Sequence, residues 1–162
     1  LAEKARLEYI EGDMSSSVLL DDAYRGIGDT VTLANTTGIG SVVAAVKPGD
    51  GSAREQAASC QKVLGGWANI ASAYATKRYR SNLINWGMLP FTTDNFEGLN
   101  LECGDRIFIP GIRNAVLNEI SDIKAFVYRK NGTVDEVTLQ LSDLSKDERK
   151  IILAGSLINY YN

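Results

Sequence analysis

The chain has 162 residues, 44% of them hydrophobic and 23% charged, which is ordinary for a folded domain and excludes a disordered chain. Its formal net charge of -3 and pI near 5.0 argue against nucleic acid or an anionic membrane as the main partner. There is no histidine, which removes the commonest general base and the commonest zinc ligand.

The length predicts one domain over residues 1–162. No apolar run approaches the roughly 18 residues of a membrane span, and the charged opening segment is unlike a signal peptide. Cys60 and Cys103 have neither metal-ligand nor redox spacing, so we expect reduced thiols and a cytoplasmic location. The missing initiator Met suggests a chain cut from something longer.

The first half predicts alternating elements. Residues 1–10 have helical spacing and end at a Gly-Asp pair, and residues 30–35 alternate as a strand does. The apolar run GIGSVVAAV, residues 38–46, predicts a strand covered on both faces. A helix from Ser52 to the Gly65-Gly66 pair follows, capped by Ser52 with Glu55 three residues later.

The middle of the chain continues this order. WANIASA, residues 67–73, predicts a buried strand, residues 74–86 predict a helix that Gly87 closes, and MLPF, residues 88–91, predicts an exit loop. The order of strand, helix, strand and helix is typical of a partly parallel sheet with helices packed on it.

The last third predicts an antiparallel region and a final helix. Residues 99–112 and 122–141 alternate with period two, and Asn131-Gly132 predicts a tight hairpin turn with both residues at positive φ. Ser145 and Glu148 form a capping box that opens the last helix.

The stretch GDGSAREQAA, residues 49–58, has two interpretations. In the first, Ser52 and Glu55 only cap a helix. In the second, a glycine turn leading into a helix leaves free amides that bind an anion, and Arg54 adds a planar fork suited to a carboxylate. The same positive field would favour the alkoxide of Ser52.

Three segments resemble one known family. GDGSAREQAA is similar to the Gly-Ser-Ser-Arg-Glu-His-Ala motif of the C-terminal swivelling domain of aconitases and of the small subunit of isopropylmalate isomerases. YATKRYRSNLINWGMLPF, residues 74–91, resembles the family's basic helix followed by Gly-(Ile/Leu/Met)-Leu-Pro. AGSLINYYN, residues 154–162, resembles its ending. Together these cover most of residues 40–162.

The resemblance implies a β/β/α swivelling domain of aconitase type, with a mixed, mostly parallel sheet, flanking helices and a hairpin, in the C-terminal part of a larger hydratase. It implies a hydro-lyase that acts on a di- or tricarboxylic hydroxy acid. Ser52 would be the catalytic base and Arg54 the arginine that binds a substrate carboxylate. Gly51, Ala53 and Arg25 of the AYRG segment would complete the substrate-binding set.

The resemblance also implies a 4Fe-4S cluster bound by other domains or by a partner large subunit. Cys60 and Cys103 are too few to hold such a cluster, so we expect activity only when this chain closes over its cluster-bearing partner. Nucleic acid and membrane are not expected as partners. Two alternatives stay open: the separate small subunit of an isopropylmalate isomerase, and a non-catalytic anion-binding module.

Some positions depart from the family pattern. Ala53 stands at the second serine, and Gln56 and Tyr79 stand where the family has histidine. The basic residues Lys77, Arg78 and Arg80 are interpreted as a solvated helix face, with an acidic substrate or a docking partner as the alternative.

Overall fold

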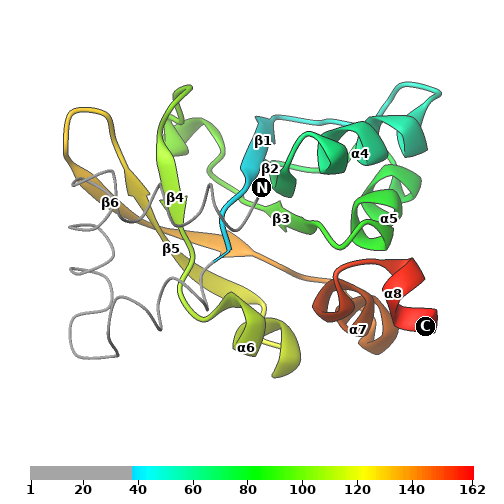
Figure 1. Cartoon of the computed structure of the whole chain (residues 1–162). Coiled ribbons are helices and arrows are strands. Elements are labelled where there is room, and N and C mark those ends of the chain that lie inside the picture. The colour runs from blue at the N-terminus through cyan, green and yellow to red at the C-terminus, as the bar shows by residue number, and fades with distance from the viewer. Residues whose placement is uncertain (1–37) are drawn as a thin grey trace. The chain divides into compact units, whose positions relative to one another are not determined.

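The computed structural model describes residues 38–162, and Figure 1 draws them in colour. The chain divides into two compact units, Leu1–Ile39 and Gly40–Asn162, and the second is described below. The helix expected over residues 1–10 and the strand expected over residues 30–35 lie outside the described residues, as does Arg25.

The second unit alternates strands and helices in its first half and carries a hairpin and three helices in its second half. Its elements are β1 (Ser41–Ala45), α4 (Arg54–Val63), β2 (Gly66–Ala71), α5 (Lys77–Asn85), β3 (Leu89–Thr92), the 3-10 turn η1 (Glu97–Leu99), β4 (Arg106–Phe108), α6 (Ile112–Leu117), β5 (Asp122–Tyr128), β6 (Val134–Gln140), α7 (Lys146–Ala154) and α8 (Leu157–Tyr161).

The described strands form one six-stranded sheet in the order β1-β2-β3-β6-β5-β4. The β1-β2 and β2-β3 pairs are parallel, whereas β3-β6, β6-β5 and β5-β4 are antiparallel. This confirms the expected α/β class with a mixed sheet, flanking helices and a hairpin, but among the described strands two pairs are parallel and three are antiparallel, so the sheet is not mostly parallel. The parallel part is confined to the three strands that the helical crossovers connect, because a parallel neighbour requires a long connection.

Strand β1 is less covered than its apolar sequence predicts. Val42 and Val43 are 37% and 39% exposed, so the expectation of a strand buried on both faces is wrong. The physical reason is position: among the described strands, β1 is at the end of the sheet order and pairs with β2 on one side. The register shifts between Ser41 and Val42, where Trp67 of β2 is passed over.

The crossovers α4 and α5 contact each other, α4 contacts β2, and α5 contacts β3. The predicted helices at 52–64 and 74–86 and the buried strand β2 are confirmed. The exit loop expected at residues 88–91 is wrong, because Leu89–Thr92 form β3, paired parallel with β2. Pro90 and Phe91 are buried there, so this short segment is a strand in the middle of the sheet order.

The two faces of β2 pack against different groups of residues. Ala68 and Ile70 point into the larger core, together with Phe91, Leu139 and residues of α6. Asn69 points the other way, toward α4 and α5, because successive side chains of a strand alternate between faces. The smaller core on that side contains Ala58, Tyr79, Leu83 and Met88.

The hairpin β5-β6 is confirmed, but its turn differs from the expected one. The amide of Gly132 donates to the carbonyl of Arg129 (2.9 Å), and the amide of Arg129 donates to the carbonyl of Thr133 (2.9 Å). Gly132 has φ 86°, while Asn131 is not among the residues with positive φ. The loop is therefore a turn followed by one left-handed glycine, rather than a two-residue turn with both centres left-handed.

The ends of α5 and α7 meet backbone to backbone. Gly87, just past α5, has φ 68°, and a Cβ built on it would lie 2.0 Å from the carbonyl oxygen of Gly155. Gly155 closes α7 with φ 86°. This close approach leaves no room for a side chain at position 87.

Within residues 38–162, no helix is both long and apolar enough to cross a membrane.

Candidate functional site

The candidate site is the turn that leads from the carboxyl end of β1 into α4, residues 46–54. Ser52 and Ala53 in this turn are exposed. Helix α4 begins at Arg54 and its N-cap is Ala53, which has no side-chain capping bond. The expected capping box of Ser52 and Glu55 is therefore wrong, because the helix starts one residue later than the box requires.

Because α4 starts one residue later than expected, the Ser52 hydroxyl does not cap the helix. Within the described residues, no hydrogen bond of the Ser52 hydroxyl is found, and its side chain is exposed at the start of a ten-residue helix. The first amides of α4 have no side-chain cap, so the positive end of the helix dipole faces outward beside Ser52. Such an arrangement attracts an anion.

Arg54 lies over the turn that precedes it. Its Nε donates to the carbonyl of Gly49 (3.2 Å) and its Nη2 donates to the carbonyl of Asp50 (3.5 Å). A guanidinium has five N–H donors, so these bonds leave three for another acceptor. Arg54 is half-buried, next to exposed Gly51 and Ala53. The structure thus brings together four of the predicted site residues.

A small cavity of about 250 Å³ lies at the carboxyl ends of β2 and β3. Its lining includes two basic residues, Lys77 and Arg80, and two acidic residues, Asp94 and Asp143. Arg80 donates to the carbonyl of Ser142 (2.6 Å), so it holds the loop before α7. Lys77 and Arg78 are exposed, in accord with a solvated helix face, but the Arg80 side chain is only 19% exposed and does not belong to it.

Tyr74 also lines this cavity, and its hydroxyl donates to the carbonyl of Phe91 (3.0 Å). Burial raises the pKa of the Tyr74 hydroxyl above its ordinary value of 10.0. Tyr74 is therefore protonated at neutral pH and does not act as a base there.

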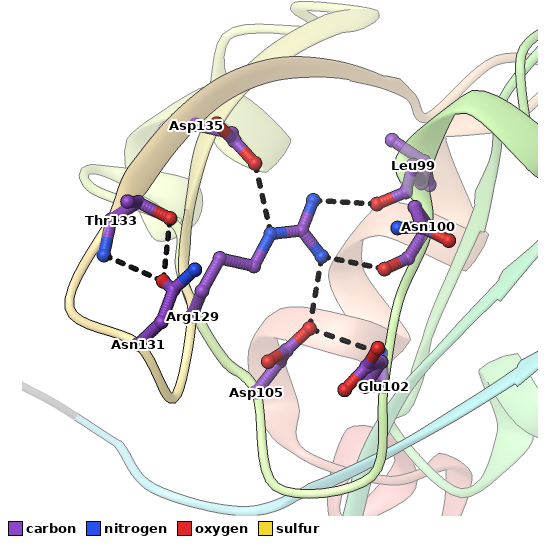
Figure 2. A network of polar contacts seen from close by, with 8 residues as sticks. All are labelled: Leu99, Asn100, Glu102, Asp105, Arg129, Asn131, Thr133 and Asp135. Carbon is purple, nitrogen blue, oxygen red and sulfur yellow. Dashed lines mark hydrogen bonds and ion pairs between the residues drawn. The ribbon is translucent and has the colours of Figure 1, made fainter.

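A second polar cluster surrounds Arg129 at the start of the hairpin loop (Figure 2). Its Nε donates to Asp135 (2.8 Å) and its Nη1 donates to Asp105 (2.9 Å). Nη1 and Nη2 also donate to the carbonyls of Asn100 (2.8 Å) and Leu99 (2.7 Å). The guanidinium thus links the hairpin to the segment between η1 and β4.

Asp105 is held as a carboxylate in this cluster. The backbone amide of Glu102 and the guanidinium of Arg129 hold the pKa of Asp105 below its ordinary value of 3.8. A cavity of about 420 Å³ lies beside the cluster. Sequence reasoning did not find this cluster, because Arg129 is 24 residues from Asp105 and two of its partners are backbone carbonyls.

The described residues do not fit an iron–sulfur cluster. Cys60 and Cys103 are both exposed free thiols, and within residues 38–162 no three His, Cys, Asp or Glu side chains are grouped to hold a metal ion. Cluster ligation requires three or four thiolates.

Residues 12–96 match the family model described as the aconitase C-terminal domain. That segment contains Ser52 and Arg54 as well as β1, α4, β2, α5 and β3.

Two aconitate hydratases are similar in sequence to this chain. Aconitate hydratase A of Rickettsia bellii is 29% identical over 145 residues, which are 87% of this chain and 16% of that protein. Aconitate hydratase A of Rickettsia conorii is 30% identical over 115 residues, 69% of this chain and 13% of that protein. The chain therefore spans about a sixth or less of the length of these relatives.

One solved structure is also similar, a 3-isopropylmalate dehydratase from Methanocaldococcus jannaschii. It is 27% identical, with a TM-score of 0.42, over 85% of this chain and 71% of that one. The family match covers more than half of the 162 residues and includes the turn at the candidate site. This chain belongs to the aconitase C-terminal domain family.

Proposed function

We propose that this chain is the substrate-closing domain of an iron–sulfur-dependent hydro-lyase that acts on a di- or tricarboxylic hydroxy acid. One observation carries the proposal: within the segment that matches the family, the Ser52 hydroxyl is exposed directly before the uncapped start of α4, with Arg54 two residues later.

Ser52 is the proposed base. As an alkoxide, its oxygen takes a proton from the carbon next to a substrate carboxylate, and the electron pair left on that carbon forms the double bond. The hydroxyl group leaves the neighbouring carbon as hydroxide, and the Lewis acidity of the cluster in the partner domains or subunit would assist its departure. The uncapped amides of α4 and its dipole favour a negative charge at this place.

Arg54 is the proposed carboxylate-binding residue. Two of its donors hold the carbonyls of Gly49 and Asp50, which fixes the plane of the guanidinium. The remaining N–H groups can face a carboxylate from the side of Gly51 and Ala53, whose backbone is exposed. Arg25, which the family resemblance adds to the substrate-binding set, stays part of the proposal.

The proposed partners are the domains or the large subunit that carry the 4Fe-4S cluster, because the described residues of this chain do not hold one. The greater length of the aconitate hydratase relatives favours cluster domains on the same polypeptide. We propose that the active site lies where Ser52 meets those domains. We also propose that the enzyme is cytoplasmic.

The test is Ser52→Ala in the complete enzyme with its cluster domains. We expect kcat to fall about 10³-fold or more with KM little changed, because a general base is lost while the carboxylate contacts remain. Steady-state kinetics with a tricarboxylate such as citrate and with a dicarboxylate such as isopropylmalate would measure this and identify the substrate class.

Ser59→Ala is the matched control. Ser59 is on α4, the helix that follows the Ser52 turn, and its hydroxyl donates to the carbonyl of Gln56 (3.1 Å), so turnover is expected to stay at the wild-type level. Undiminished turnover of the Ser52→Ala enzyme would remove Ser52 from the mechanism and favour a non-catalytic anion-binding module.

A further inference from the structure

The turn that carries Ser52 is fastened to the loop that follows β2. The amide of Ala75 donates to the carbonyl of Pro48 (2.9 Å), and the amides of Ser72 and Ala73 donate to the carbonyl of Val46 (3.1 and 3.2 Å). These bonds join the carboxyl ends of two neighbouring parallel strands. The position of the site turn therefore depends on the segment that opens α5.

The carbonyl of Gly49 is the central acceptor of this attachment. It accepts from Nε of Arg54 (3.2 Å) and from Oγ1 of Thr76 (3.1 Å). Thr76 comes from 27 residues further along the chain, and its hydroxyl is part-buried at this contact. One carbonyl thus joins the proposed carboxylate-binding arginine to the start of α5.

Thr76 has a second role that fixes the direction of its hydroxyl. It is the N-cap of α5, where its Oγ1 accepts from the amide of Tyr79 (3.2 Å). A hydroxyl has one proton to donate, and this proton is directed at the carbonyl of Gly49. Removing the donor while keeping the acceptor would separate the two roles.

The ring of Tyr79 packs against the backbone of the turn at Gly49. Gly49 has φ 95°, and a Cβ on it would lie 2.4 Å from the Tyr79 ring, so the backbone rests on the ring. The Tyr79 side chain is buried, and its hydroxyl accepts from Nδ2 of Asn69 (3.2 Å). Oδ1 of Asn69 in turn accepts from Nε2 of Gln61. The ring is thus fixed between α4, α5 and β2.

We infer that Thr76 is a positioning residue, which holds the Gly49 carbonyl and through it sets the place of Arg54 and Ser52. The inference rests on the proposed function of these two residues. A misplacement of about 1 Å at a reacting group can reduce a rate by about 100-fold, so the loss of one such contact should be visible in kcat.

Three variants of the complete enzyme test this. Thr76→Asp keeps a good N-cap acceptor for α5 but cannot donate to the Gly49 carbonyl, Thr76→Val loses both functions, and Thr76→Ser keeps both. We expect the Asp and Val variants to lose about tenfold to 100-fold in kcat, and Thr76→Ser to retain most of the activity. Hydrogen exchange of the amides of Ala73 and Ala75, which donate to the carbonyls of Val46 and Pro48 and so join the turn to the loop after β2, should quicken in the Asp and Val variants only.

Two results would overturn the inference: unchanged exchange of the Ala73 and Ala75 amides in Thr76→Asp, or full turnover in that variant while Ser52→Ala is inactive. Amide hydrogen exchange also tests this inference independently of the proposed function. If Ser52→Ala kept full turnover, the proposed function and the link of Thr76 to kcat would both fail. Exchange in Thr76→Asp would still decide whether Thr76 holds the turn.

Discussion

At position 129 a single guanidinium connects parts of the chain that are far apart in the sequence. Arg129 is 15% exposed and contacts two carboxylates and two backbone carbonyls, and Asp105 is only 5% exposed. By contrast, the Lys124–Glu136 pair on the same hairpin is 62% and 56% exposed. The two pairs allow a comparison of a covered ion pair with a solvated one.

Replacement of Arg129 by methionine is expected to lower the melting temperature by several degrees, because it removes the ion-pair partner of Asp105 and the side-chain donor to the carbonyls of Leu99 and Asn100. Lys124→Met is the control and should change stability by less than about 1 kcal/mol, since exposed ion pairs contribute little. Thermal unfolding followed by circular dichroism would measure both, and equal effects would contradict the cluster's structural role.

The same cluster predicts how stability depends on pH. Because the pKa of Asp105 is lower in the folded chain than its ordinary value of 3.8, its contribution is present above that pH and is lost as the pH falls through the folded-state pKa. In Arg129→Met the amide of Glu102 still lowers the pKa but the guanidinium does not. The acid transition of that variant should therefore begin at a higher pH.

At the scale of elements, two serines had similar sequence signals but have different roles. Ser145 accepts from the amide of Glu148 (3.2 Å), and Glu148 accepts in return from the amide of Ser145 (2.8 Å), so the predicted capping box of α7 is confirmed. Ser52, followed three residues later by Glu55, does not cap α4.

Ser145→Ala should therefore destabilise the protein by about 1 kcal/mol, because a helix loses its N-cap. Ser52→Ala should leave stability unchanged, since no capping bond is lost. Urea unfolding of both variants would measure the difference. A loss of stability in Ser52→Ala as large as that in Ser145→Ala would contradict the observed start of α4.

Elements with local signals could be predicted from the sequence, and those fixed by distant neighbours could not. Glycine stops and apolar spacing located α4 and α5, a capping box located the start of α7, and alternation located the hairpin. The single helix expected from Ser145 to the end of the sequence is divided at Gly155 into α7 and α8. The exposure of Val42 and Val43 depends on where β1 stands in the sheet, which local sequence does not encode. The segment of β3 was too short to reveal its period, and only its pairing with β2 makes it a strand.

The same distinction applies to the site. The serine, the arginine and the glycine turn are contiguous in sequence, so one motif predicted them together. Thr76 and Tyr79 reach the turn from α5, and their contacts depend on tertiary packing. The helix start also moved by one residue, which a capping motif alone does not resolve.

At the scale of the whole molecule, this chain covers only part of its relatives. It spans 16% of the Rickettsia bellii aconitate hydratase. Its described residues carry an exposed serine turn but no group that could hold a metal ion. These observations support the proposal that catalysis needs domains beyond these 162 residues.

We therefore expect residues 1–162 alone to contain no iron and to show no measurable hydratase turnover, and we expect activity after recombination with the cluster-bearing part of the enzyme. Iron analysis and the absorbance change of an unsaturated product would measure both. Turnover by the isolated chain would contradict the proposal that this domain supplies the base and its partner supplies the cluster.

The contact between Gly87 and Gly155 affects how genetic data on this protein should be interpreted. Almost any substitution at position 87 would push two helix ends apart, although the residue has no chemical role. In a saturation mutagenesis screen, position 87 should score as poorly as a catalytic residue. Intolerance to substitution would therefore mark Ser52 and Gly87 alike, and only assays that separate the amount of folded protein from its turnover would tell them apart.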